Sequence, residues 1–347
     1  KADLFSMFME RCQDFGRPTA ELGFVTPYVW MFIVSYEKIR SKLITSATFK
    51  SLIQLEYNAF EPACVPVCTF VIGKVNIKNY VSSYIKLSEF KGHENQSPRV
   101  LEAIGDKNCE WFYFAKSDDF KKIPGSPMAY WVSESVFNAY ESGVSIGTLS
   151  EVGGGLQTGD NGRFIRNWHE PAFNNIGLNI SSAIDAKRSH LSWFPCNKGG
   201  GYRKWYGNQV EVINWANDGE ALKANTPSAV IRNEGTYFKP VAGWSKITSG
   251  GLAFRYYDAG FIHNDASCMV VCEDETRLIS IISAVDSNCT SSLFGTLNPT
   301  LNFVPGQMAG FPLPENIESN MKIFSKFGAQ AIEIARSDWD AYERSWD

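Results

Sequence analysis

The stretch SLIQLEYNAFEPACVPVCTFVIGKV (residues 51–75) contains two apolar runs, 51–60 and 65–75, that lie close together in the sequence. Both runs are rich in Val, Ile, Leu and aromatic residues, a composition that predicts β-strands. Because only a short connection joins them, we expect the two strands to form an antiparallel pair.

The segments before this pair alternate between helical and extended patterns. Apolar residues occur at helical spacing up to residue 15 or so, and again at 32–44. Between these two segments, LGFVTPYVW (22–30) is a continuous apolar run of the kind that predicts a strand buried on both faces. The order helix, strand, helix, strand, strand predicts the closing part of an α/β sheet.

The rest of the chain divides by composition. Residues 91–104 are polar and predict a linker, whereas the stretch after 143 is rich in glycine and in short strand patterns. A long helical periodicity follows near the end and predicts a helix packed on its own domain. The predicted organisation is an α/β sheet at 1–90, a linker or helical connector at 91–143, a mixed α+β domain at 144–313 and a C-terminal helix at 314–347.

The composition limits the possible functions. The chain has 347 residues and a net charge of −4, so no overall positive field indicates a nucleic-acid partner. Its eight cysteines lack the spacing of a zinc site, so we expect no metal and interpret them as reduced thiols of a cytoplasmic protein. No apolar run is long enough to span a bilayer, so no membrane partner is expected. The sequence begins without Met, within a helical pattern, and is interpreted as a piece of a longer protein.

The segment GLQTGDNGRFIRNWHE (155–170) combines glycines, short polar side chains and two arginines. A phosphate cradle, a turn between two strands and an edge that reads DNA bases each use such residues. The segment lacks the Gly-Lys-Ser/Thr ending of a P-loop, which argues against the phosphate cradle. We expect a turn that leaves a strand at Leu156 and re-enters one at Phe164, with positive φ at Gly159 and Gly162.

A second candidate region lies between Lys187 and Val210, where five cations occur without any acidic residue. Cations attract phosphates, glycines permit close backbone approach, and aromatic rings offer stacking surfaces. The alternative is an ordinary solvated basic loop. Since 144–313 as a whole has 13 basic and 14 acidic residues, the prediction depends on this clustering alone. The candidate contact residues are Lys198, Arg203, Lys204, Trp205 and Tyr206.

Two groups of motifs resemble a known family. DLFSMFMERC (3–12), GFVTPYVW (23–30) and the closing strand pair are similar to the C-terminal part of the catalytic domain of gamma-class adenine-specific DNA methyltransferases. Five later motifs look like the adenine methyltransferase of phage-growth-limitation (BREX) defence systems; they are KIPGSPMAYWVSESV, GLQTGDNGRFIRNWHE, PCNKGGGYRKWYGN, WSKITSG and LNPTLNFVPGQMAGFPL. The motifs follow the family's order, so the resemblance covers nearly the whole chain.

The resemblance implies an S-adenosylmethionine-dependent enzyme of restriction-modification or phage defence that methylates adenine in double-stranded DNA. Other subunits of a defence complex are implied as further partners. In the catalytic part it implies that Phe60 stacks on a flipped-out adenine and that Asp3 and Phe8 contact the cofactor. The alternative for Phe60 is hairpin core, and for Phe8 an ordinary amphipathic face.

The resemblance also makes residues 144–313 the target-recognition domain. It implies DNA contacts in the glycine-rich turn and in WSKITSG, through Gly159, Asp160, Asn161, Arg163 and Lys246. Arg163 and Arg166 are three residues apart and would face opposite sides of a strand, so we expect only one, Arg163, to point at DNA. The alternative is a turn that only positions other loops.

One departure from the family limits the activity that is expected. The family's glycine-rich cofactor loop and its Asn-Pro-Pro-Tyr sequence do not occur here, and Asn298–Pro299 in LNPT lacks the second Pro and the Tyr. We therefore expect no S-adenosylmethionine to be tightly bound to this chain alone and expect the chain to be inactive, while the full-length parent is active. The alternative function is a DNA-specificity module without catalysis; a carbohydrate-binding protein is a third class, against which the cysteine usage argues.

Overall fold

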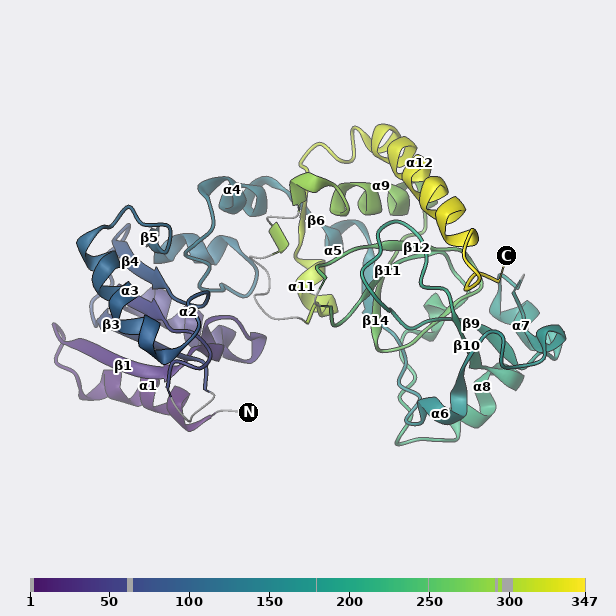
Figure 1. The fold of residues 1–347 in the computed structure, drawn as a ribbon, viewed down its shortest axis with the longest axis horizontal. Coiled ribbons are helices and arrows are strands. Elements are labelled where there is room, and N and C mark those ends of the chain that lie inside the picture. Colours follow the sequence, from purple (N-terminus) through teal and green to yellow (C-terminus); the bar gives the residue numbers. More distant parts are fainter. Residues whose placement is uncertain are drawn as a thin grey trace. The chain divides into compact units, whose positions relative to one another are not determined.

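The computed structural model describes residues 3–60, 65–178, 180–248, 250–290, 293–294 and 302–346. The chain forms two compact units, Lys1–Glu141 (unit 1) and Ser142–Asp347 (unit 2) (Figure 1). The residues predicted as a linker or connector therefore belong almost entirely to unit 1. Cys64 and the Asn298–Pro299 pair lie outside the described residues.

Unit 1 is built around a sheet with the strand order β1-β3-β2-β4-β5. The strands are β1 (Glu21–Pro27), β2 (Thr48–Gln54), β3 (Val67–Gly73), β4 (Val81–Lys86) and β5 (Phe112–Lys116). β2 and β3 are antiparallel, with Leu52 opposite Phe70, so the strand pair predicted from 51–75 is confirmed. β2 and β4 are parallel, and the other neighbours in the sheet are antiparallel.

The first strand differs from its prediction. The apolar run 22–30 is divided between β1 and a 3-10 turn, η1 (Tyr28–Met31). β1 is an edge strand of the described sheet and Val25 is 68% exposed, so burial on both faces is wrong for the described residues. The apolar run instead carries Trp30 into the core, where its ring stacks on Phe49.

The described helices of unit 1 are interspersed among its strands along the chain. They are α1 (Leu4–Phe15), η2 (Val34–Tyr36), α2 (Glu37–Ser46), α3 (His93–Gly105), η3 (Ser117–Lys122) and α4 (Glu134–Ser142). The helix predicted at 32–44 begins later, because the buried Arg40 guanidinium binds the carbonyls of Trp30, Ile33 and Gly125 and holds the preceding chain in 3-10 turns.

Residues 93–104 lie in the helix α3, so of the two expectations for this stretch the helical connector fits and the plain linker is wrong. α3 has a largely polar surface, which is why its composition suggested a linker, but Ala103 is fully buried. The buried Gln96 side chain accepts a hydrogen bond from the Glu56 N–H at 3.1 Å and donates one to the Phe90 carbonyl at 2.6 Å. These two bonds hold the helix against the connection that follows β2.

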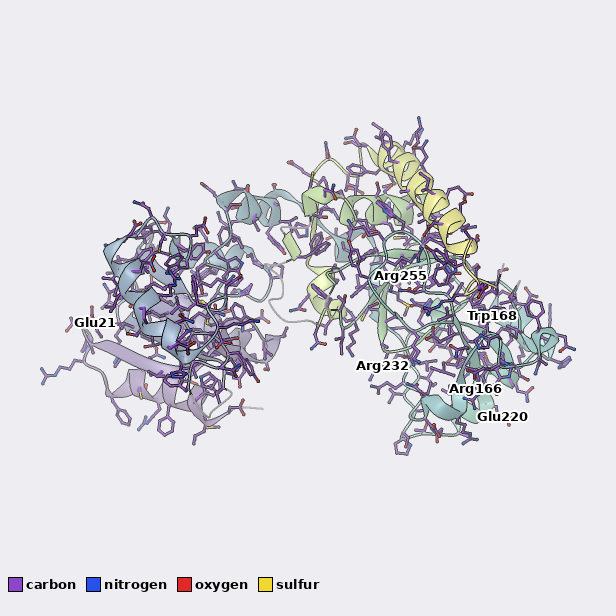
Figure 2. All side chains as sticks on the ribbon, viewed as in Figure 1. Glu21, Arg166, Trp168, Glu220, Arg232 and Arg255 are labelled. Carbon is purple, nitrogen blue, oxygen red and sulfur yellow. The ribbon has the colours of Figure 1, made fainter. Side chains whose placement is uncertain are left out.

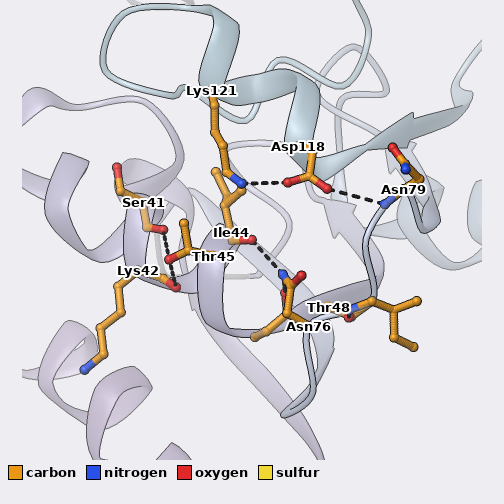
Figure 3. A network of polar contacts seen from close by, with 11 residues as sticks. Ser41, Lys42, Ile44, Thr45, Thr48, Asn76, Asn79, Asp118 and Lys121 are labelled. Carbon is orange, nitrogen blue, oxygen red and sulfur yellow. Dashed lines mark hydrogen bonds and ion pairs between the residues drawn. The ribbon is translucent and has the colours of Figure 1, made fainter.

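A polar network fixes the end of α2 to the connection between β3 and β4 (Figure 3). The Asn76 amide donates to the carbonyls of Ile44 and Ala47, at 2.9 and 3.0 Å. The Thr48 hydroxyl donates to the Val75 carbonyl and accepts from the Ile77 N–H. The last carbonyls of a helix need such partners, so this network stabilises the helix end.

Unit 2 is a mixed α+β body. One of its sheets has the order β12-β11-β14-β7, with strands Arg255–Tyr257, Val241–Ser245, Ser267–Val271 and Glu151–Gly154. Another has the order β13-β9-β10-β8, with strands Ile262–His263, Trp193–Asn197, Glu211–Asn214 and Ile165–Asn167. A short pair joins β15 (Pro312–Leu313) to β6 (Val144–Ser145).

The described helices of unit 2 are mostly short. They are α5 (Ile146–Leu149), α6 (Asn161–Phe164), η4 (Phe173–Asn175), α7 (Ala183–Ser189), α8 (Ala216–Lys223), η5 (Glu234–Thr236), α9 (Glu275–Val285), η6 (Asn288–Thr290), α11 (Pro305–Ala309) and α12 (Met321–Asp340). α12 runs along α9, so the C-terminal helix packs on its own unit as predicted, but it spans Met321–Asp340 rather than 314–347 (Figure 1). Within the described ranges, no helix combines the length and apolarity needed to cross a membrane.

Candidate functional site

The glycine-rich segment of unit 2 turns between β7 and β8. Gly159 has a φ of +70°, as predicted, and Asp160 begins the single helical turn α6. The Asp160 carboxylate accepts a hydrogen bond from the Arg163 N–H at 3.1 Å, and the Thr158 hydroxyl donates to the Asn161 side chain at 2.6 Å. The turn is therefore braced by Asp160 and Asn161. Gly162 lies inside α6 without positive φ, so that part of the prediction is wrong.

The glycines of this segment permit close contact with other parts of the protein. A Cβ on Gly155 would lie 2.3 Å from the carbonyl oxygens of His263 and Asn264. A Cβ on Gly159 would lie 2.6 Å from the Ser228 carbonyl carbon. No real Cβ contact is that short, so these glycines bring three distant segments of unit 2 together.

The two arginines of the segment have different environments. Arg163 is exposed, its guanidinium lies 4.8 Å from the Phe164 ring centroid, and no described acidic side chain pairs with it. Arg166 forms an ion pair with Glu170 at 3.5 Å and donates to the Ile165 carbonyl at 2.8 Å. Figure 2 labels Arg166, together with Arg232, which is described below. Of these two arginines, Arg163 is thus the one whose guanidinium is free to contact a ligand. It is also the one that was predicted to point at DNA.

The three cations predicted to contact phosphate all have partners within unit 2. The Lys198 ammonium lies 3.8 Å from the Glu211 carboxylate. The Arg203 guanidinium pairs with Asp338 of α12, and the Lys204 ammonium donates to the Asp286 carbonyl at 2.7 Å. These contacts fix the segment between Lys187 and Val210, called the basic segment below, against α9, α12 and β10.

The aromatic residues of the basic segment and Lys246 also have different environments. Tyr206 is 2% exposed and lies beneath the Arg336 guanidinium, so its ring offers no surface and cannot serve as a DNA contact in this structure. Trp205 is half-buried and has a φ of +71°. Lys246 follows β11, where its N–H donates to the Ala266 carbonyl at 3.0 Å, beside the Gly199 backbone.

Asp286 is the buried acidic group behind this segment. Its carboxylate accepts hydrogen bonds from the Phe254 N–H at 2.9 Å and the Trp205 N–H at 3.4 Å. Burial raises the pKa of Asp286 to about 7, although the nearby Lys204 and Arg255 favour its charged form. This carboxyl therefore holds the backbone at Trp205.

The predicted residues of unit 1 lie on its surface. Phe60 follows β2 and is 49% exposed, and Phe8 is on the exposed face of α1. The Asp3 carboxylate accepts a hydrogen bond from the Tyr36 hydroxyl. A hollow of about 250 Å³ is lined by residues of α1, η2 and α2, such as Met7, Tyr36 and Ile39. Asp3, Phe8 and Phe60 do not line it. The structure therefore does not gather the three predicted residues in this hollow.

Three polar residues that were not predicted from the sequence lie together in unit 2. The Gln157 amide nitrogen donates to the Asp265 carboxylate at 2.9 Å, and Arg232 donates to the Gln157 amide oxygen at 3.4 Å. Gln157 lies in the segment 155–170, but Arg232 and Asp265 are far from it in the sequence and match no motif, so only the tertiary structure could bring the three together.

Comparison with known proteins shows which proteins this chain is similar to. The Eco57I restriction-modification methylase family matches residues 1–60. The adenine-specific methyltransferase PglX of Lacticaseibacillus casei (strain Zhang) is 32% identical over 100% of this chain, and BrxX of Escherichia coli O9:H4 (strain HS) is 31% identical, also over 100%. This chain is homologous over its whole length to PglX and BrxX. The resemblance that the sequence motifs indicated is thereby confirmed.

The homologous region is a minor part of these relatives, because the chain spans 29% of PglX and 28% of BrxX. Solved structures share the fold. The type IIL restriction-modification enzyme MmeI in complex with DNA matches 99% of this chain and 46% of its own, with a TM-score of 0.56 and 11% identity. The DrdV–DNA complex matches 96% of this chain and 39% of its own, with a TM-score of 0.51 and 10% identity.

Proposed function

We propose that this chain is part of an S-adenosylmethionine-dependent, adenine-specific DNA methyltransferase, here called the parent protein. Unit 1 completes its catalytic sheet, and unit 2 recognises the target in double-stranded DNA. The observation that carries the proposal is the homology to PglX, which extends through both units without a break in coverage. A match limited to residues 1–60 would support a methyltransferase sheet and nothing about unit 2.

Unit 1 supplies aromatic surface for this function. A base that leaves the DNA stack loses its neighbours, and an exposed ring such as that of Phe60 replaces one of them. The exposed ring of Phe8 suits an apolar contact with the cofactor, which supplies the methyl group for the adenine amino nitrogen. Asp3 suits a contact with the cofactor less well, because its carboxylate already accepts the Tyr36 hydroxyl; we assign it to positioning the start of α1.

Unit 2 supplies the groups for DNA. The exposed Arg163, presented by the braced turn at Gly159, Asp160 and Asn161, is the candidate for a base contact. Lys198, Arg203 and Lys204 keep N–H donors beyond those used in their internal contacts, and their charges attract phosphates. Lys246 and the half-buried Trp205 extend the same group of residues.

The proposal is tested with the parent protein in a bacterial host that lacks adenine methylation. Sequencing of the host genome for N6-methyladenine is expected to show methylation at one DNA motif. Replacement of residues 142–347 by the corresponding segment of PglX is expected to replace that motif by the PglX motif. A genome without N6-methyladenine would contradict the methyltransferase function, and an unchanged motif after the exchange would contradict recognition by unit 2.

The biological setting follows from the relatives and is part of the same proposal. We place the parent protein in the cytoplasm, in a phage-defence system with further subunits. Co-purification of the tagged parent protein with the products of its neighbouring genes checks the subunits. Plaque counts of phage on hosts with and without the complete gene set check the defence, and equal counts would contradict it.

A further inference from the structure

Gln157, Arg232 and Asp265 form a continuous line of hydrogen-bonded side chains in unit 2. Arg232 Nη2 donates to Gln157 Oε1 at 3.4 Å, and Gln157 Nε2 donates to Asp265 Oδ2 at 2.9 Å. Arg232 is exposed, and Gln157 and Asp265 are half-buried. Within the described residues, no acidic side chain forms an ion pair with Arg232. The line therefore begins with an accessible cation and ends with a carboxylate.

The backbone beneath this line is held on both sides of Gln157. The Gln157 N–H donates to the Val230 carbonyl at 2.9 Å, and the Val230 N–H donates back to the Gln157 carbonyl at 2.8 Å. The Asp265 N–H donates to the Leu156 carbonyl at 2.8 Å. The Arg232 carbonyl accepts the Tyr237 hydroxyl at 2.8 Å. Side chains fixed in this way present their polar atoms in a defined order, which recognition of a specific ligand requires.

The order of donors and acceptors indicates the kind of ligand. Phosphate oxygens accept hydrogen bonds but do not donate them, so a phosphate site consists of donors and positive charge. The Asp265 carboxylate would repel a phosphate at one end of the line. Base edges in the major groove combine acceptors, such as guanine O6 and N7, with donors, such as the amino groups of cytosine and adenine. A line that begins with a guanidinium and contains an amide and a carboxylate matches base edges.

We propose that Gln157, Arg232 and Asp265 determine the DNA sequence that the parent protein recognises. This inference rests on the proposed function of unit 2. Arg232 donates to a guanine edge, and Gln157 contacts the adjacent base through its remaining N–H and lone pair. Asp265 acts as a positioning residue, because its carboxylate holds the Gln157 amide in one orientation.

The experiment measures sequence preference directly. The full-length parent protein and its variants are mixed with duplex DNA containing a random core, and the bound molecules are sequenced. The wild-type protein is expected to enrich one motif. Arg232→Ala and Gln157→Ala are each expected to lower the preference for the wild-type base at one motif position by about 5- to 150-fold, and to leave the other positions unchanged. Methylation of the same pool is read separately.

Matched variants separate base reading from other roles. Arg344→Ala removes an exposed arginine near the C-terminal end of unit 2, outside the candidate contact segments, and is expected to leave the motif unchanged. Asp265→Asn retains an acceptor for Gln157 and is expected to keep the motif, whereas Asp265→Ala is expected to reproduce part of the Gln157→Ala change. Urea unfolding of each variant identifies losses of folding.

Five outcomes are informative. A changed preference at one position for Arg232→Ala, absent from Arg344→Ala, supports the inference. Equal weakening at every motif position overturns it, as does an unchanged motif, and so does a wild-type protein that enriches no motif. Enrichment of a motif without any methylation contradicts the proposed methyltransferase activity while the assignment of the three residues stands.

Discussion

The guanidinium of Arg203 lies 5.0 Å from the centroid of the Trp339 ring, so a cation–π contact joins the basic segment of unit 2 to helix α12. Asp338, the preceding residue, forms an ion pair with the same guanidinium. A Cβ on Gly207 would lie 3.0 Å from the Trp339 ring, so the chain after Arg203 passes close to the helix. α12 therefore helps to shape the region that carries the predicted phosphate contacts.

The first prediction concerns those contacts. Replacement of Lys198, Arg203 and Lys204 together by Ala in the parent protein is expected to weaken binding to all DNA sequences similarly. The slope of log K against log salt should fall by about 0.9 for each lost phosphate contact, or roughly 2.7 for three. DNA-binding constants measured at several salt concentrations between about 50 and 200 mM give this slope. The control is Lys322→Ala with Lys326→Ala, two exposed cations of α12. An unchanged slope in the triple variant would show that these three cations contact no phosphate and have only a structural role in unit 2.

The second prediction concerns Phe60. Its exposed ring is expected to stack on the flipped adenine, so Phe60→Ala in the parent protein should lose about 1–3 kcal/mol of base stacking. Methylation rate should fall by more than DNA affinity. Phe60→Tyr keeps an aromatic face and should retain most of the activity. Single-turnover methylation and equilibrium binding on the same duplex give the two numbers, and equal rates for Phe60→Ala and wild type would exclude the stacking role.

The third prediction compares Arg163 with Arg166. Arg163→Ala should weaken binding to the target sequence by about 1–3 kcal/mol if the guanidinium reads a guanine edge. Arg166→Ala should have less effect on binding, because the Arg166 guanidinium already bonds Glu170 and the Ile165 carbonyl. Competition between target and random duplexes measures the difference. A larger loss from Arg166→Ala would reverse the assignment.

The fourth prediction concerns pH and Asp286. Because burial raises the pKa of Asp286 from about 3.8 to about 7, the folded state binds this proton more tightly than the unfolded state does. The stability that this group contributes is present below the unfolded pKa and is lost as pH rises from about 4 to about 7. The free energy of unfolding of the wild type should therefore decrease with rising pH over this range. The Asp286→Asn variant should lack the part of this decrease that comes from Asp286.

The comparison must be made between wild type and variant at each pH, because a second buried group titrates in the opposite sense. Burial lowers the pKa of His263 to about 3, so its contribution to stability is lost as pH falls below about 6.5. Urea unfolding of the whole chain at several pH values between 5 and 8 or so gives the difference. An identical pH dependence in Asp286→Asn would show that Asp286 does not carry a raised pKa.

The fifth prediction concerns the chain by itself. The sequence contains no Asn-Pro-Pro-Tyr, and Asp3 is bonded to Tyr36, so we expect the isolated 347-residue chain to bind S-adenosylmethionine weakly and to transfer no methyl group to DNA. Titration calorimetry and a tritium-transfer assay check the two statements. Tight stoichiometric binding would show that this chain by itself suffices for a cofactor site.

The sequence alone determined the features that depend on neighbouring residues. The antiparallel pair of β2 and β3, the positive φ of Gly159 and the brace at Asp160 follow from local apolar pattern and turn chemistry. The helix near the C-terminus was also predictable, because its apolar periodicity continues over many residues. Homology to the methyltransferases was visible in motifs of consecutive residues for the same reason.

Only the tertiary structure decided which side chains remain available for a ligand. The sequence shows that Tyr206 is aromatic and that Arg203 is charged, but not that Arg336 covers the first and Asp338 binds the second. It likewise separates Gln157, Arg232 and Asp265, which backbone pairing brings into one line. Local sequence sets propensities over a few residues, whereas exposure and hydrogen-bond partners depend on segments that meet only when the chain folds.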